Sequence, residues 1–459
     1  MPLKSFNLFR CALAVAVVAI CLGGVAIAQP PVPLDAAGRA ADWWFVFKGN
    51  AQKFPGCKTD AARKCQFGGS KIQGKPWGTQ YGFAKAGDTV LAEGPDCLGD
   101  SPGDPLSRTF AEIYNGAAHY VIWNDQFHND PQPDRNVPWG HSKGFIAWDR
   151  NGDGFVVQGT TPGWPIAGRP NLDKGKGGNT LGCTFGDDVE YSQDFFAVRL
   201  SKADLLIVIE AMGVASVVTD PNDLQLVDTG VTPEAIRNQS KPANVSDAEW
   251  EVANKVAMLN VVSKAATVYK AALSVRSGVI TVIAKPPAVV APPWQIVSAE
   301  LGAIDLRVAN WSGPAPSIGS KTSSPMITCW DKSLPAHYGT VEIAATGRLF
   351  GQVVGLDAPG AADVGTDASG QPLHLEGPDH NHAKFAISKT GNISIFGDMN
   401  QQGLASYVKD QSECGVHQDA RGGMFFVLDD ANMHKVLASV FDDGFTLPFK
   451  DVTTAPRKK

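Results

Sequence analysis

The chain has 459 residues, which is too long for one compact core and suits two or three domains or one large duplicated unit. Hydrophobic residues make up 44% and charged residues 19%, which indicates a globular protein and excludes a disordered one. The formal net charge of −6 argues against bulk nucleic-acid binding through a basic face. A polyanionic substrate would need a positive field confined to a cleft, and acid would add charge by protonating the histidines.

The N-terminus has the pattern of a secretory signal peptide over residues 1–28. Lys4 and Arg10 precede an apolar run, and an Ala-Ile-Ala cleavage site ends the leader. Removing these two positive residues leaves a mature chain of net charge −8, from −6 − 2. An uncleaved anchor is the alternative, but the run is short for a membrane span. The pattern predicts export without an anchor, to the periplasm or medium of a bacterium, or to the lysosome in a eukaryotic host.

Six cysteines remain after the leader, and an even number in an exported chain predicts disulfides. No CxxC pair is present, which argues against a structural zinc site. Six cysteines allow about fifteen pairings. Proximity, and keeping each half of the chain self-contained, favours pairing Cys57 with Cys65, Cys97 with Cys183, and Cys329 with Cys414.

Strand and helix patterns alternate through the first half, residues 29–285. Aromatic and β-branched runs predict strands, and capping residues before apolar periodicity predict helices. Asp104, Ser201 and Ser246 are the expected N-caps, and the two serines begin capping boxes. Strands are expected at residues 42–48, 119–123, 144–148, 155–158 and 279–284, and helices at 105–115, 201–212 and 246–273.

A stiff Pro-rich stretch, residues 286–298, is expected to link this half to a second one, residues 299–459. Strands and helices alternate in both halves, which predicts mixed α/β (α+β) layers. In the second half, strands are expected at residues 304–308, 340–345, 385–388, 393–396 and 424–428, and a helix at 431–440.

Two similar hairpins carry the strongest chemical signal. His141-Ser142-Lys143 and His382-Ala383-Lys384 each lead into a strand, a Gly-containing turn and a return strand that ends in Gly plus a polar residue. Residues i and i+2 of a strand face the same side, so each motif places an imidazole beside an ammonium group. The repeat predicts an internal duplication in which each half supplies half of one site.

Two imidazoles and two lysines suit the hydrolysis of a phosphodiester. One neutral imidazole attacks phosphorus and forms a phosphohistidine, while the other, protonated, gives its proton to the leaving oxygen. The lysines stabilise the non-bridging oxygens, so no metal or cofactor is expected. The return strands would bring Thr160, Asp398 and Asn400 back beside these groups.

The two His-x-Lys motifs, the second followed by Gly-Asp-Met-Asn, resemble the phospholipase D superfamily and, more closely, the deoxyribonuclease II family. The resemblance implies two phospholipase D-like halves, each a mixed β-sheet flanked by helices, related by a pseudo-two-fold axis around one cleft. It also implies a secreted or lysosomal endonuclease that needs no metal, favours acid and leaves 3′-phosphate ends on DNA. The matching pieces are Asp42-Trp43 before a strand ending in Lys48, Asn124-Asp125-Gln126, His141 to Lys143 with Asp149, Gly397 to Asn400, and Arg421-Gly422-Gly423.

The resemblance assigns catalytic or phosphate-binding roles to His141, Lys143, His382, Lys384 and Asn400. His141 is the expected nucleophile, because the first-half histidine usually has this role in the superfamily, and His382 is the expected acid. The residues expected to bind substrate or to orient the catalytic groups are Asn124, Asp125, Asp149, Thr160, Asp398 and Arg421.

The second motif departs from the family. The family places Asp directly before this histidine, whereas Asp379-His380-Asn381 precede His382 here. His380 and His382, together with Asp379, could instead bind zinc. Lys384 lies at the next position on the same face, however, and its charge would repel a metal. A phosphodiesterase for another substrate and a catalytically silent binding protein are the alternatives to a nuclease.

Three further features have two interpretations each. Asp149-x-Asn151-x-Asp153-Gly154 begins like a calcium loop but lacks the acidic twelfth residue, which favours a hairpin turn. Asn124-Asp125-Gln126 would either cap a turn or contact substrate. Arg421 fits an exposed position slightly better than a phosphate contact. DNA is the expected partner, and the sequence leaves open whether the chain forms a homodimer.

Overall fold

A computed structural model describes most of the chain after the predicted leader. The predicted leader, all six remaining cysteines and His380 lie outside the described residues, so the disulfide prediction lies outside them as well. The described residues are 29–49, 81–94, 98, 103–114, 118–126, 137–162, 192–220, 227–311, 331, 333–336, 338–344, 346–356, 362–366, 372–375, 381–401 and 420–441.

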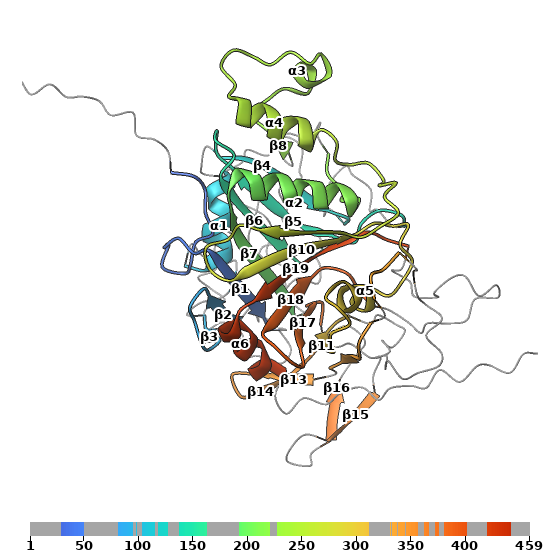
Figure 1. Ribbon diagram of the computed structural model, residues 1–459. Coiled ribbons are helices and arrows are strands. Elements are labelled where there is room, and N and C mark those ends of the chain that lie inside the picture. The colour runs from blue at the N-terminus through green and yellow to red at the C-terminus, as the bar shows by residue number, and fades with distance from the viewer. Residues whose placement is uncertain are drawn as a thin grey trace, which may run out of the picture.

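An eight-stranded antiparallel sheet forms the first half, in the order β3-β2-β1-β7-β6-β5-β4-β8 (Figure 1). Its aromatic and β-branched central strands are buried along their whole length, as a sheet covered on both faces requires. The strands are β1 (Trp43–Lys48), β2 (Tyr81–Lys85), β3 (Ala92–Glu93), β4 (His119–Asn124), β5 (Lys143–Trp148), β6 (Gly154–Gly159), β7 (Gln193–Leu200) and β8 (Val227–Asp228). The helices of this half are α1 (Pro105–Tyr114), α2 (Lys202–Val214), α3 (Pro233–Arg237) and α4 (Asp247–Val256).

A seven-stranded sheet forms the second half, in the order β12-β11-β17-β18-β19-β10-β9, and only its β11–β12 pair is parallel. Two separate hairpins, β13–β14 and β15–β16, accompany it. The strands are β9 (Tyr269–Leu273), β10 (Val279–Lys285), β11 (Leu306–Ala309), β12 (Val341–Ile343), β13 (Thr346–Leu349), β14 (Gln352–Gly355), β15 (Ala362–Thr366), β16 (Pro372–Leu375), β17 (Phe385–Ser388), β18 (Ile393–Gly397) and β19 (Gly423–Asp429). The helices are α5 (Pro293–Glu300) and α6 (Ala431–Phe441).

The two sheets share one hydrophobic core. The rings of Phe196 and Phe396 stack with centroids 4.0 Å apart, and Phe45 meets Phe385 edge-on at 5.7 Å. Aromatic pairs of this kind add about 0.5–1.5 kcal/mol each beyond the area that they bury. Helix α2 contacts strands of both sheets. The halves are therefore packed into one body, which fixes the strand ends of one against those of the other.

The same order of elements occurs twice along the chain. The series β1-α1-β4-β5-β6-β7-α2 is matched by β10-α5-β11-β17-β18-β19-α6, and the corresponding strands are neighbours in the same order within their sheets. The strand pairing beside the two lysines also matches. Lys143 pairs with Gly159 at the end of β6, and the Lys384 carbonyl accepts a hydrogen bond from the amide of Gly397 at the end of β18. The repeated order supports a duplication, while the pseudo-two-fold axis stays a prediction.

The mixed α/β fold is confirmed, and two details differ from expectation. The helix expected to reach residue 273 ends at Val256 with Ala257 as its C-cap, and the next stretch contains the β-branched residues Val261 and Val262, which disfavour a helix. β9 and β10 precede the predicted linker at residues 286–298 yet belong to the second sheet, and α5 begins within that stretch with proline at its first turn. Within the described ranges, no helix has the length and apolar character that a membrane crossing requires.

Candidate active site

The two His-x-Lys motifs meet where the sheets join. His141 lies just before β5, and His382 lies just before β17. The side chain of His141 is buried, whereas that of His382 is partly exposed. The His141 amide donates to the Gly422 carbonyl at 2.9 Å, and the His382 amide donates to the Ser192 carbonyl at 2.7 Å. Ser192 precedes β7 as Gly422 precedes β19, so each histidine is hydrogen-bonded to the equivalent point of the opposite half.

The contacts of His141 define its tautomer. Its Nδ1 lies 2.5 Å from the Asp398 carbonyl oxygen, which only accepts, so this nitrogen carries the proton. Its Nε2 lies 3.3 Å from Lys143 Nζ and 3.4 Å from Asn400 Nδ2, and both of these atoms donate. Nε2 therefore holds a lone pair, which is the form that a nucleophilic imidazole needs.

A buried carboxylate positions the first lysine. Asp125 Oδ1 accepts from Lys143 Nζ at 2.6 Å, and Asp125 Oδ2 accepts from Arg421 Nη2 at 2.7 Å. Arg421 also donates from Nε to the Trp139 carbonyl at 2.9 Å and is only 3% exposed. The expectation that Arg421 is exposed was wrong, because Asp125 holds its guanidinium inside the protein.

The second half-site receives two side chains from β7 of the first half. Gln193 Nε2 lies 3.5 Å from His382 Nδ1, and Asp194 Oδ1 accepts from the Lys384 amide at 2.6 Å. Thr160 Oγ1 donates to Gln193 Oε1 at 2.7 Å and so orients that amide. The indole of Trp311 meets His382 nearly edge-on, with centroids 5.4 Å apart.

Sequence reasoning missed Gln193, Asp194 and Trp311. The first two had a weak signal, as polar residues directly before the Phe-Phe run of a strand. Trp311 had none, because the residues that surround it in the fold are distant in the sequence.

The structure brings most of the predicted residues together but leaves Asp149 apart. Asn124 caps its own turn, since its Oδ1 accepts from the Gln126 amide at 2.9 Å. Asp149 follows the far end of β5, roughly 17 Å of strand away from Lys143. There its Oδ1 accepts from the amides of Asn151 and Asp153, as the hairpin-turn interpretation predicts.

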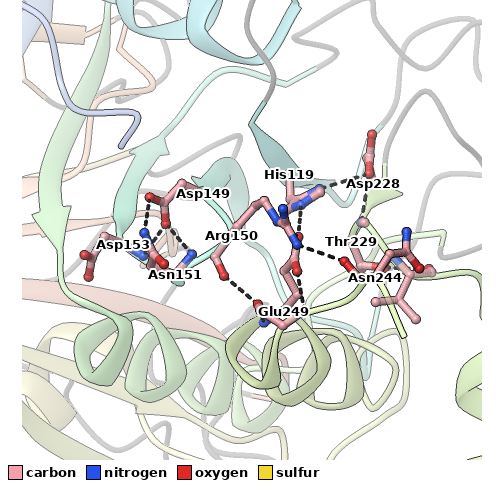
Figure 2. A network of polar contacts seen from close by, with 12 residues as sticks. His119, Asp149, Arg150, Asn151, Asp153, Asp228, Thr229, Asn244 and Glu249 are labelled. Carbon is pink, nitrogen blue, oxygen red and sulfur yellow. Dashed lines mark hydrogen bonds and ion pairs between the residues drawn. The ribbon is translucent and has the colours of Figure 1, made fainter. Parts of the chain in front are cut away.

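Asp149 lies beside a separate polar network that joins the edge of the first sheet to α4 (Figure 2). His119 Nε2 lies 3.3 Å and Arg150 Nε 3.1 Å from Glu249 Oε1, and His119 Nδ1 lies 3.5 Å from Asp228. These contacts hold α4 against the sheet and are remote from the two His-x-Lys motifs. Among the described residues, no group of three or more His, Cys, Asp and Glu side chains is placed to hold a metal ion.

Burial and neighbouring cations keep both imidazoles neutral. Burial, and then Lys143, depress the pKa of His141 well below its ordinary value, although Asp125 opposes this. Burial, and then Lys384, Lys143 and Lys48, depress the pKa of His382 in the same way. Acid is therefore needed to protonate either ring in the absence of substrate.

Three buried carboxylates differ in protonation. Burial favours a raised pKa for Asp125, but Lys143, His141 and Arg421 hold its pKa well below the usual range. Burial raises the pKa of Asp398 to about 7 against the opposing effect of Ser142 and Lys143. Burial likewise raises the pKa of Asp194 and lowers that of Lys384. The cluster thus pairs one firmly ionised acid with two that hold protons more readily.

Replacing Asp398 with Asn should make stability less dependent on pH. Between the ordinary pKa of 3.8 and about 7, the folded protein holds a proton on Asp398 that the unfolded chain has lost. Wild-type stability therefore falls as pH rises through this window, by about 1.4 kcal/mol per pH unit from this group. The Asn variant lacks this loss. Its free energy of unfolding in urea, relative to that of wild type, should therefore rise with pH up to about pH 7 and then level off.

The matched control for this substitution is Glu210→Gln, an acid-to-amide change at the half-exposed partner of Lys255. The difference in free energy of unfolding between this variant and wild type should not rise with pH across that window. A constant difference between D398N and wild type would contradict the raised pKa of Asp398.

Imidazole and ammonium groups from both halves of the fold form a site suited to phosphodiester hydrolysis. A family model described as Deoxyribonuclease II matches residues 33–329, which is more than half of the chain. The chain belongs to the deoxyribonuclease II family, and this membership supports a hydrolase that acts on DNA. The match includes His141 and Lys143 and ends before His382. A search of curated proteins found no match.

Proposed function

We propose that this protein is a metal-independent endonuclease that cleaves DNA through a phosphohistidine on His141. The observation that carries the proposal is the tautomer of His141, whose Nε2 lone pair is flanked by Lys143 and Asn400. A second imidazole and ammonium pair, His382 and Lys384, comes from the other half. Both histidines are fixed through their backbone amides, which favours a preformed site.

In the first step, Nε2 of His141 attacks phosphorus as the bond to the 5′-oxygen breaks. The protonated ring of His382 gives its proton to that oxygen, which leaves as a 5′-hydroxyl. Lys143 and Lys384 offset the charge on the non-bridging oxygens, and the Asn400 amide is placed to donate to one of them. The Nδ1 contact with the Asp398 carbonyl stabilises the charge that His141 acquires.

In the second step, His382 takes a proton from water, and the resulting hydroxide attacks phosphorus. The N–P bond breaks, His141 is regenerated, and the product keeps its phosphate on the 3′-oxygen. The cycle begins with a protonated His382 in a cationic surrounding, and this predicts a preference for acid.

The proposed setting is outside the cytoplasm. The leader pattern of residues 1–28 and the even number of cysteines after it support export, with those cysteines paired as disulfides. An acidic compartment or medium would favour the protonated form of His382.

Supercoiled plasmid tests this proposal directly. We expect the purified protein to nick and linearise plasmid in excess EDTA, faster at about pH 5 than at about pH 7.5. The ends should block polymerase extension until a phosphatase removes the 3′-phosphate. A catalytically silent binding protein would leave plasmid intact at both pH values. A phosphodiesterase for another substrate would also do so but would cleave a chromogenic phosphodiester. Ends with 5′-phosphates would refute the proposed chemistry.

A further inference from the structure

Two buried lysines outside the His-x-Lys motifs occupy equivalent positions in the two halves. Lys48 is the last residue of β1 and Lys285 the last residue of β10, and both are 0% exposed. Lys48 lies opposite Gln193 at the start of β7, and Lys285 lies opposite Gly423 at the start of β19. Each lysine therefore pairs with the first residue of the neighbouring strand, β7 for Lys48 and β19 for Lys285, at the end of the strand next to the site.

The lysines also make the same local contact. Lys48 Nζ donates to the carbonyl of the next residue, Gly49, at 3.1 Å, and Lys285 Nζ donates to the carbonyl of the next residue, Pro286, at 3.3 Å. Lys285 Nζ donates in addition to the Arg421 carbonyl at 2.6 Å. By the register, the position equivalent to Arg421 is Tyr191, which lies outside the described residues.

The segment that Lys285 contacts is the one that holds His141. The Gly422 carbonyl, one residue after Arg421, accepts the His141 amide. The Arg421 side chain also contacts Asp125, which in turn binds Lys143. On the other side, Lys48 lies opposite Gln193, whose neighbour Ser192 accepts the His382 amide.

A buried ammonium group is a weak source of stability even when it has partners. Replacing a buried charge and its partners with apolar residues of similar volume is often neutral or stabilising. Apart from Thr281, the other residues of the strands that carry these lysines are apolar, with sequences WWFVF and VITVIA. A need for sheet stability alone therefore does not account for a buried lysine at the same place in both halves.

We propose that Lys48 and Lys285 are a matched pair of positioning residues, each of which holds the segment to which the opposite half's histidine is hydrogen-bonded. The effect on cleavage rests on the proposed function. The effect on the histidines does not, because it is a property of the resting protein. Lys48 has a further effect, since its charge disfavours protonation of His382.

Substitution by methionine removes each charge while keeping the length of the side chain. We expect Lys285→Met to lower kcat for plasmid cleavage by about 10- to 100-fold with little change in KM, because His141 is displaced while no substrate contact is lost.

We expect Lys48→Met to shift the pH profile of kcat upward by about half a pH unit or more, because His382 then keeps its proton to higher pH. Lys48→Arg keeps the charge, so its pH profile of kcat should match that of wild type. Lys255→Met, at an exposed ion pair with Glu210, is the matched control and should leave both quantities unchanged.

NMR titration of the histidine rings supplies a readout that needs no cleavage. The signal of His382 should titrate at higher pH in K48M, and the His141 signal should move in K285M, while neither changes in K255M. If wild type fails to cut plasmid but these signals move, the proposed function fails and the positioning role stands. Folded variants with wild-type kcat, pH profile and histidine signals would overturn the positioning role. Loss of folding in both K48M and K285M would also overturn it, because support of the sheet would then explain both lysines.

Discussion

Replacing either His141 or His382 with Ala should lower the rate of DNA cleavage by about 10³-fold or more. H141A removes the atom that would bond to phosphorus, and H382A removes the proton donor for the leaving oxygen. One surviving histidine cannot perform both roles, because the rings belong to opposite halves and are hydrogen-bonded to different segments. Single-turnover cleavage of an end-labelled duplex at acid pH measures the loss.

The control for this pair is His434→Ala. His434 lies in α6 of the second half, and its Nε2 contacts the Ser388 carbonyl at 2.8 Å, away from both motifs. This variant should cleave at nearly the wild-type rate, and unfolding curves should confirm that all three variants fold. More than a tenth of wild-type activity in H141A or H382A would refute a shared site. A phosphate trapped on His382 would reverse the proposed roles.

Replacing Asp125 with Ala should destabilise the protein by about 3–5 kcal/mol, because Lys143 and Arg421 would lose the buried carboxylate between them. Activity should fall as well, since Lys143 would no longer be held beside His141. The pKa of Asp125 is depressed, so its stabilising effect is present above the ordinary pKa of 3.8 and disappears as pH falls through the folded-state value. Urea unfolding at neutral pH should therefore show the full loss, and the gap to wild type should narrow in strong acid.

Glu210→Ala provides the comparison for this loss. It removes the carboxylate of a surface ion pair with Lys255, a kind of contact worth at most about 1 kcal/mol. If D125A and E210A destabilise the protein equally, the Asp125 carboxylate has no special structural role. Asp125→Asn keeps the shape without the charge and should lie between Ala and wild type in stability.

The parts of the fold that were predictable depend on local chemistry. The two hairpins after the histidines were expected because apolar strands flank Gly-containing turns, and they are present as β5–β6 and β17–β18. Ser201 and Ser246 form the expected capping boxes of α2 and α4. The His-x-Lys spacing placed the four main polar groups at the ends of equivalent strands. Each of these features needs only a few neighbouring residues to define it.

The parts that were missed depend on distant contacts. Arg421 resembles an exposed residue in a Gly-rich segment until Asp125 is placed beside it. Gln193 and Asp194 reach the second half-site only because β7 begins where the sheets meet. Lys48 was expected to end a strand in a piece that resembles the family, but its equivalence to Lys285 emerges only from the strand registers. The membership of β9 and β10 in the second sheet was not predictable, because it depends on the pairing of β10 with β19, a strand far downstream.

The hydrogen bonds that each histidine makes to the opposite half bear on the order in which the protein matures. The contacts of His141 with Asp398 and Asn400 join residues 257 and 259 positions apart, and contacts of such long range form late in folding. A nascent or truncated chain that lacks the C-terminal strands would have an unrestrained His141 and no second imidazole. On the proposed function, such a chain has only half of a site. Docking of the two sheets would then complete the site and act as an activation step.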